Sequence, residues 1–229
     1  MGVLFRVFVF LTLVSCDSGS VCLKGENSTD KVKQHVSLFS ADIRKRSRDA
    51  AVEIMSYNSA GRQISGSGAY IVYKQQHFIL TAAHVVSASP VAMIKNDGET
   101  ILGNVAFVDE DTDVALVSIE GMFTRTPIVW SVSKKHKIGS EVYYTGYPNT
   151  YALLTIEGKI AGYDRGMTII HSYVWRGASG SAVLDKKGKI VGVVSAVDVG
   201  TDVIGMPTII EDVGIVVPVH KVEEFLKSR

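Results

Sequence analysis

Short apolar runs recur along the chain from residue 51 onward, and Gly, Asn and Asp turns separate them. The runs of the first half are 51–55, 69–73, 78–80, 91–94, 105–108 and 114–119. The runs of the second half are 141–145, 153–160, 168–170, 181–184, 189–195 and 214–217. Many short strands at regular spacing are typical of β-barrels and β-sandwiches. The pattern therefore predicts an all-β fold.

The two ends of the chain have different patterns. Between Pro218 and Lys227 the apolar residues recur at helical spacing, and Pro218 suits a first helical turn, so we predict a C-terminal helix over residues 218–228. Residues 17–34 are rich in Ser, Gly, Asp, Lys and Asn and have little apolar content. Such a composition is typical of a flexible linker. We predict a tether over residues 17–48.

The first 16 residues have the pattern of a secretory leader. Arg6 precedes the apolar run 7–14, which is too short to span a bilayer and has the length of a signal-peptide core. Leu13-Val14-Ser15-Cys16 follows and resembles a bacterial lipobox, in which the cysteine carries the lipid. We predict a signal peptide over residues 1–16 and lipidation of Cys16. An ordinary secretion signal and a buried N-terminal strand are the alternatives.

Composition narrows the class of protein. The chain has 229 residues and a formal net charge of +1, which does not indicate a nucleic-acid partner. Arg44-Lys45-Arg46 with Arg48 is the one basic run, and we interpret it as a solvated stretch. The two cysteines, Cys16 and Cys22, lie in or near the leader, so a disulfide framework is excluded from the rest of the chain. The histidines outside the motif described next lack metal-ligand spacing, and we expect no metal and no cofactor.

Three separated segments carry the residue types of nucleophilic catalysis. They are Leu80-Thr81-Ala82-Ala83-His84, Asp111-Thr112-Asp113-Val114-Ala115-Leu116 and Arg176-Gly177-Ala178-Ser179-Gly180-Ser181-Ala182. A serine hydroxyl is a weak nucleophile at neutral pH and needs an adjacent base, and imidazole has a suitable pKa near 6.5. That base in turn needs a carboxylate that orients its other nitrogen. A fold that brings the three segments together would therefore activate Ser179.

These motifs, in this order, resemble the three signatures of the chymotrypsin-like serine peptidases. The gaps of 29 and 66 residues between His84, Asp113 and Ser179 are similar to those of compact bacterial members, above all the HtrA (Deg) protease domain without a PDZ domain. The resemblance implies two six-stranded antiparallel β-barrels with a C-terminal helix. It places a protease domain at 49–229, with barrels at about 50–130 and 135–218.

The resemblance also implies the roles of individual residues. His84, Asp113 and Ser179 correspond to the catalytic triad, and the backbone N–H groups of Gly177 and Ser179 correspond to the oxyanion hole. Ser195 stands where a serine of the family steadies the catalytic aspartate. One departure is Ser181, because most relatives have glycine at that position.

We expect the substrate pocket to be apolar and partly filled. Its predicted lining is Tyr173, Arg176, Ser195, Ala196 and Val197. Because the lining offers no carboxylate for a basic side chain, the pocket favours Val, Ala or Ile before the scissile bond. Arg176 is expected at the rim of this pocket, where it could bind an acidic substrate side chain. We interpret Arg176 instead as a solvated side chain.

Together these features predict a serine endopeptidase that acts on polypeptides through an acyl-enzyme. We expect it to be secreted or held in the cell envelope by a lipid, in protein processing or quality control, with an oligomeric state that the sequence leaves open. Two alternatives remain. One is a catalytically silent binding protein with the same fold, and the other is a virus-encoded processing protease.

Overall fold

The structure is a computed structural model that describes residues 42–229, except 123, 149–150 and 202–206. For strand residues 196–201 and 207–211 it describes the backbone alone. Asp42–Arg229 forms one compact unit. The predicted signal peptide, Cys16 and the tether as far as residue 41 lie outside the described residues. No helix within the described part of the chain is long and apolar enough to cross a membrane.

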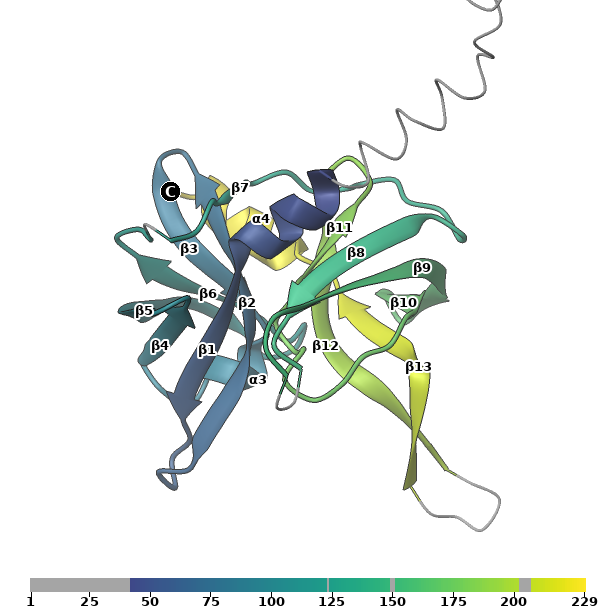
Figure 1. Cartoon of the computed structure of the whole chain (residues 1–229), viewed down its shortest axis with the longest axis horizontal. Helices are drawn as coiled ribbons and strands as arrows, with labels where there is room; N and C mark the ends of the chain where they lie inside the picture. Colours follow the sequence, from purple (N-terminus) through teal and green to yellow (C-terminus); the bar gives the residue numbers. More distant parts are fainter. Residues whose placement is uncertain (1–41, 123, 149–150, 202–206) are drawn as a thin grey trace, which may run out of the picture. The chain divides into compact units, whose positions relative to one another are not determined.

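The first barrel occupies the N-terminal half of this unit (Figure 1). Its strands are β1 (Ala51–Tyr57), β2 (Gln63–Tyr73), β3 (Gln76–Thr81), β4 (Val91–Asn96), β5 (Glu99–Asp109) and β6 (Val114–Ile119). They are ordered β1-β4-β5-β6-β3-β2, and antiparallel pairing of β1 with β2 closes the ring. A two-residue strand, β7 (Ile128–Val129), adds to β2 in parallel.

The second barrel is built in the same way from the C-terminal half. Its strands are β8 (Glu141–Gly146), β9 (Leu154–Asp164), β10 (Met167–His171), β11 (Ala182–Asp185), β12 (Ile190–Thr201) and β13 (Pro207–Val217). They close in the order β10-β13-β12-β11-β8-β9. Inward residues such as Tyr144, Ile160 and Ile170 are buried in its core.

All twelve predicted apolar runs are strands, and the prediction of two six-stranded antiparallel barrels is confirmed. The strands extend beyond the apolar runs because hydrogen-bonded pairing continues into polar sequence. The strand β2 begins at Gln63, six residues before the predicted start, since residues 63–68 pair with β1 as far as Tyr57. Apolar content thus marks the buried part of a strand, whereas its ends depend on the partner strand.

Three helices complete the unit. The prediction of a C-terminal helix is confirmed by α4 (His220–Lys227), which buries Val222 and Leu226. Residues 42–50 are also helical, with Ile43 and Ala50 in the core, so residues 42–48 of the predicted tether belong to the packed domain. Both helices lie on the upper side in Figure 1. The four-residue α3 (Ala83–Val86), which the sequence did not predict, lies on the lower side.

Candidate active site

The side chains of His84 and Asp113 meet on the first barrel. His84 lies in α3, directly after β3, and Asp113 ends the turn between β5 and β6. The Nδ1 atom of His84 lies 2.9 Å from Oδ2 and 3.0 Å from Oδ1 of Asp113. The backbone N–H of His84 also donates to Oδ1, at 3.0 Å. The backbone and the ring of His84 are therefore both held by one carboxylate.

The carboxyl group of Asp113 is stabilised in its ionised form. Burial alone would raise its pKa, but hydrogen bonds from the His84 ring, the Ser195 hydroxyl and the His84 backbone N–H together hold the pKa below its ordinary value. An ionised carboxylate can only accept hydrogen bonds, so Nδ1 of His84 must carry the proton. This leaves Nε2 of His84 as the basic nitrogen.

The second barrel contributes Ser179 to the site that contains His84 and Asp113. Ser195, on β12, links the two halves: its hydroxyl donates to Oδ2 of Asp113, as the resemblance implied, and its carbonyl accepts a hydrogen bond of 3.0 Å from the Ser179 hydroxyl. Among the described residues no hydrogen bond joins Ser179 to His84. The Ser179 side chain is thus turned toward Ser195.

The backbone that leads into Ser179 leaves two donors free. Gly177 has a φ of 92°, a conformation that favours glycine, and it lies in a turn that is closed by a bond from the Ala178 N–H to the Trp175 carbonyl. Within the described part of the chain, neither the Gly177 N–H nor the Ser179 N–H donates a hydrogen bond. Two unpaired N–H groups beside a serine are the donors that an oxyanion needs.

A buried serine of the first barrel, Ser67, holds this loop in place. Its N–H donates to the Ser179 carbonyl at 2.8 Å, and its hydroxyl donates to the Gly177 carbonyl at 2.6 Å. The same hydroxyl accepts from the Tyr147 N–H at 2.8 Å, and the Ser67 carbonyl accepts from the Thr81 hydroxyl at 2.8 Å. The N–H and the hydroxyl of Ser67 therefore join the loop to the first barrel, whereas its carbonyl bonds to Thr81 within that barrel.

Gly180 fits against the same serine so closely that no side chain is possible. A Cβ atom there would lie 1.9 Å from the Ser67 carbonyl oxygen and 2.3 Å from the Thr81 hydroxyl oxygen. Its φ of 95° also lies in the region that favours glycine. The following residue, Ser181, is fully buried, and its hydroxyl has no hydrogen-bond partner among the described residues.

The structure separates the predicted pocket residues. Ser195 is at the site, whereas Arg176 is exposed. Tyr173 is 52% exposed, stacks on Trp175 and lines a cavity of about 400 Å³ whose lining includes none of the other predicted site residues. The side chains of Ala196 and Val197 lie outside the described part. The pocket lining as a whole therefore stays a prediction.

Sequence reasoning missed the positioning role of Ser67. The available signal was Gly66-Ser67-Gly68, a polar residue between two glycines inside a strand. Neighbouring side chains leave no room for a Cβ atom at either glycine. A Cβ atom on Gly66 would lie 2.7 Å from Val85, and one on Gly68 would lie 2.6 Å from Ile79. The partners of Ser67 are 14 to 112 residues away, so no local pattern indicates them.

The chain is similar in sequence to several known proteins. A family model described as "Trypsin-like peptidase domain" matches residues 66–193, which is more than half of the chain. The Do-like serine protease HtrA of Lactococcus lactis is 22% identical over 193 residues, 76% of this chain and 47% of that protein. A Haemophilus influenzae relative, whose name describes a periplasmic Do/HhoA-like serine protease, is 27% identical over 145 residues, 58% of this chain and 30% of that protein.

Among solved structures, the Rv3671c protease of Mycobacterium tuberculosis in its active form has the same fold. It superposes with a TM-score of 0.63 at 21% identity, covering 81% of this chain and 82% of that one. The chain spans less than half the length of the two curated relatives described above. The predicted resemblance to chymotrypsin-like peptidases of the HtrA type is confirmed. The chain belongs to the trypsin-like peptidase domain family.

Proposed function

We propose that this protein is a serine endopeptidase in which Ser179 is the nucleophile, His84 the general base and Asp113 the residue that orients the base. The observation that carries the proposal is the chain of contacts from His84 through Asp113 and Ser195 to Ser179. It joins residues of two barrels that are separated by up to 111 positions, and it leaves a basic nitrogen and two N–H donors beside one serine.

The proposed reaction begins with a rotation of the Ser179 side chain about its Cα–Cβ bond, from the Ser195 carbonyl toward Nε2 of His84. His84 takes the hydroxyl proton while Oγ attacks the carbonyl carbon of the scissile peptide, and Asp113 stabilises the resulting imidazolium. The N–H groups of Gly177 and Ser179 receive the oxyanion. His84 then protonates the leaving amine, and water hydrolyses the acyl-enzyme by the same steps.

Polypeptides are the proposed substrates. Arg176, Ser195, Ala196 and Val197 remain the proposed pocket lining, whereas the exposed, stacked position of Tyr173 does not support a place for it there. An apolar pocket selects Val, Ala or Ile before the scissile bond, because burying an unpaired charge is costly. Peptide-library profiling tests this proposal. A dominant preference for Lys, Arg, Glu or Asp at that position would contradict it without affecting the triad.

The proposed location is the exterior or the cell envelope. It is supported by the leader-like sequence of residues 1–16 and by the name of the Haemophilus influenzae relative. Lipidation of Cys16 would hold the protein at a membrane. Mass spectrometry of the mature N-terminus tests this, and an unmodified Cys16 would reject the anchor while leaving secretion open.

The catalytic assignment is tested by comparing Ser179→Ala and His84→Ala with Ser59→Ala, an exposed serine in the turn after β1. Both site variants should lose at least about 10³-fold in peptide hydrolysis, whereas Ser59→Ala should match the wild type. A fluorophosphonate probe should label the wild type and Ser59→Ala but not Ser179→Ala. Labelling of the Ser179→Ala variant, or its unchanged hydrolysis, would refute the assignment.

A further inference from the structure

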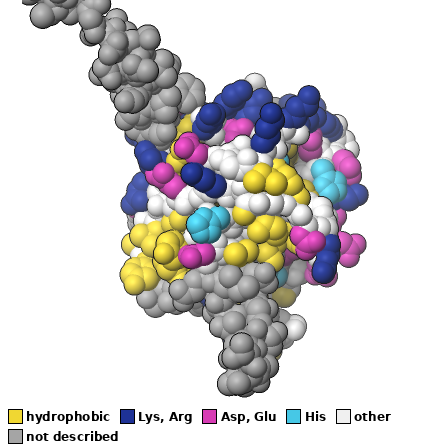
Figure 2. All heavy atoms as spheres, turned by 90° about the vertical axis from the view of Figure 1, so that its right-hand side faces the viewer, with side chains coloured by type: hydrophobic (Ala, Val, Ile, Leu, Met, Phe, Trp, Pro, Cys, Tyr) yellow, Lys and Arg dark blue, Asp and Glu magenta, His cyan; other side chains and the backbone are white. Residues whose placement is uncertain are grey.

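Seven cationic side chains gather on the second barrel and the helix of residues 42–50, although they come from three separate segments. The set, which we call the basic face, is Arg46, Lys134, Lys135, Lys137, Lys186, Lys187 and Lys189. It holds seven of the 24 Lys and Arg residues of a chain whose formal net charge is only +1. Figure 2 shows Lys and Arg side chains gathered along the upper part of the molecule.

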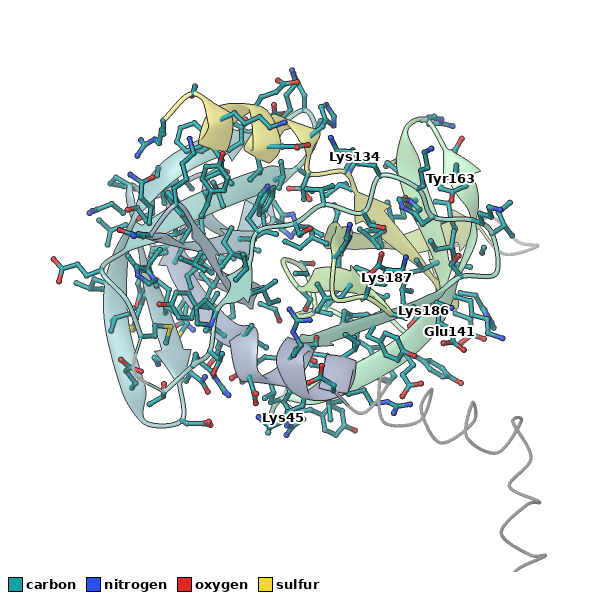
Figure 3. The ribbon with its side chains drawn as sticks, turned by 90° about the horizontal axis from the view of Figure 1, so that it is seen from above. Lys45, Lys134, Glu141, Tyr163, Lys186 and Lys187 are labelled. Carbon is teal, nitrogen blue, oxygen red and sulfur yellow. The ribbon has the colours of Figure 1, made fainter. Side chains whose placement is uncertain are left out.

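Backbone pairing holds two of these segments together. The Ser133 N–H donates to the Ile190 carbonyl, and the Ile190 N–H donates to the Ser131 carbonyl, both at 2.8 Å. The Ser133 hydroxyl donates to Asp185 at 2.7 Å. These bonds place the loop that carries Lys134 beside the Asp185–Gly188 turn. Figure 3, which looks down on the upper side of Figure 1, shows Lys134, Lys186 and Lys187 over the second barrel.

Arg46 connects the third segment to this turn. Its guanidinium lies against Gly188, where an added Cβ atom would come within 2.5 Å of Nη1. Arg46 therefore places the helix of residues 42–50 next to the turn that carries Lys186 and Lys187.

The positive charge of the basic face is largely uncompensated. Lys134 lies 3.7 Å from Glu223, but the other six cations have no ion pair with a described residue. Glu223 itself is shared with Lys227, whose hydrogen bond lowers the pKa of that carboxyl. Two other carboxylates lie near the basic face. Asp185 already accepts bonds from the Lys187 and Lys189 N–H groups and from the Ser133 hydroxyl. Glu141, next to the Val142 that pairs with Asp185, accepts a bond from the Tyr143 hydroxyl.

Apolar side chains project beside the lysines. Ile138 is 66% exposed at a tight turn, in which the Ser140 N–H donates to the Lys137 carbonyl and Gly139 has a φ of 84°. Tyr163 is 51% exposed, and its hydroxyl donates to the His136 carbonyl at 2.8 Å. Lysines around an exposed aliphatic residue and a tyrosine match the boundary between lipid headgroups and acyl chains.

We propose that the basic face docks this domain onto a membrane surface that contains anionic phospholipids. The lysines pair with headgroup phosphates, and Ile138 enters the interface. In Figure 1 the helix of residues 42–50 and the turn between β11 and β12, which carries Lys186 and Lys187, lie at the top, whereas α3, which carries the candidate base His84, lies on the lower side. A docked domain therefore keeps its candidate catalytic residues turned toward the aqueous phase. This inference concerns binding and does not depend on the proposed catalysis.

The test uses the full chain, produced without export so that Cys16 carries no lipid, in co-sedimentation with phospholipid vesicles. The vesicles are phosphatidylcholine alone, or phosphatidylcholine with about 30% phosphatidylglycerol, at about 50 mM and about 500 mM salt. We expect binding to the anionic vesicles at low salt and release at high salt. Equal binding to both kinds of vesicle would show that apolar sequence alone is responsible and would overturn the proposal.

Two double variants with the same charge change locate the surface. Lys186→Gln with Lys187→Gln should weaken binding to the anionic vesicles roughly 30-fold, since each lysine near such a surface contributes about fivefold. Arg62→Gln with Lys95→Gln, two cations of the first barrel, should leave binding unchanged. Ile138→Ser should weaken it several-fold. Equal binding by wild type and the Lys186/Lys187 variant, or binding to duplex DNA without binding to vesicles, would refute the proposal.

Discussion

The hydroxyl of Ser67 donates a 2.6 Å hydrogen bond to the carbonyl oxygen of Gly177, and this bond spans the two barrels. The N–H groups of Gly177 and Ser179 are the two backbone donors of the candidate site that have no acceptor among the described residues. Because the Gly177 carbonyl is held from the first barrel, the peptide units on either side of it cannot turn freely. The geometry of the candidate oxyanion hole is thus coupled to a residue that contacts no substrate.

Replacing Ser67 by alanine should lower kcat about tenfold and leave KM within about twofold, because a loosened Gly177 weakens transition-state stabilisation more than ground-state binding. The matched control is Ser47→Ala. Ser47 is also buried, and its hydroxyl donates to Thr145 at 2.8 Å and not to the loop that carries Ser179. Both variants should lose about 1–3 kcal/mol of unfolding free energy.

Steady-state kinetics and urea unfolding of both variants separate a positioning role from a structural one. A fall in kcat that Ser47→Ala shares would show that general destabilisation, and not the Ser67–Gly177 bond, is responsible.

A side chain at Gly180 should be incompatible with the fold. Gly180→Ala places a methyl group 1.9 Å from the Ser67 carbonyl, at a positive φ, so we expect a loss of more than about 4 kcal/mol or failure to fold. Gly162→Ala is the control, because nothing lies within 4 Å of its added Cβ atom. Thermal unfolding of the two variants measures the difference. A Gly180→Ala protein as stable as Gly162→Ala would contradict the close approach.

Asp113 should make stability depend on pH at the acid end. Its pKa is lowered in the folded protein, so the ionised group stabilises the fold above its ordinary value of 3.8, and this contribution is lost as the pH falls through the lower folded value. The difference in unfolding free energy between wild type and Asp113→Asn should be constant above about pH 5 and shrink below about pH 4. Urea unfolding from pH 7 to pH 3 measures this difference. If the difference in unfolding free energy grows toward low pH, the prediction is wrong.

The same variant should lose about 10⁴-fold in kcat at neutral pH, because an asparagine stabilises the wrong tautomer of His84. Peptide hydrolysis at neutral pH, with active-site titration to count folded enzyme, measures the loss. Retention of most of the activity would remove Asp113 from the proposed mechanism.

Ser181→Ala should be neutral or stabilising. The hydroxyl of Ser181 is buried without a partner among the described residues, so its removal relieves a desolvation cost of about 1–2 kcal/mol. Differential scanning calorimetry should show a melting temperature equal to or above that of the wild type. A clear fall in melting temperature would mean that the hydroxyl bonds to a buried water.

Local sequence motifs predicted part of the candidate site but not the boundary of the tether. Thr-Ala-Ala-His and Asp-Val-Ala-Leu could be predicted to converge because the family resemblance supplies the topology, and His84 does contact Asp113. The tether boundary could not be predicted, because residues 42–48 are polar except for Ile43 and Ala41 precedes them. One fully buried side chain, Ile43, attaches this segment to the core, and a single apolar residue is no pattern.

By itself, the sequence determined the all-β class, the position of each strand core and the three motifs, since alternation, turn residues and short signatures are properties of neighbouring residues. The tertiary structure alone decided that Ser67 holds Gly177, that Tyr173 lines another cavity, and that the Arg46 guanidinium lies against Gly188. These relationships depend on barrel closure and on strand register, which bring together atoms that no local spacing relates.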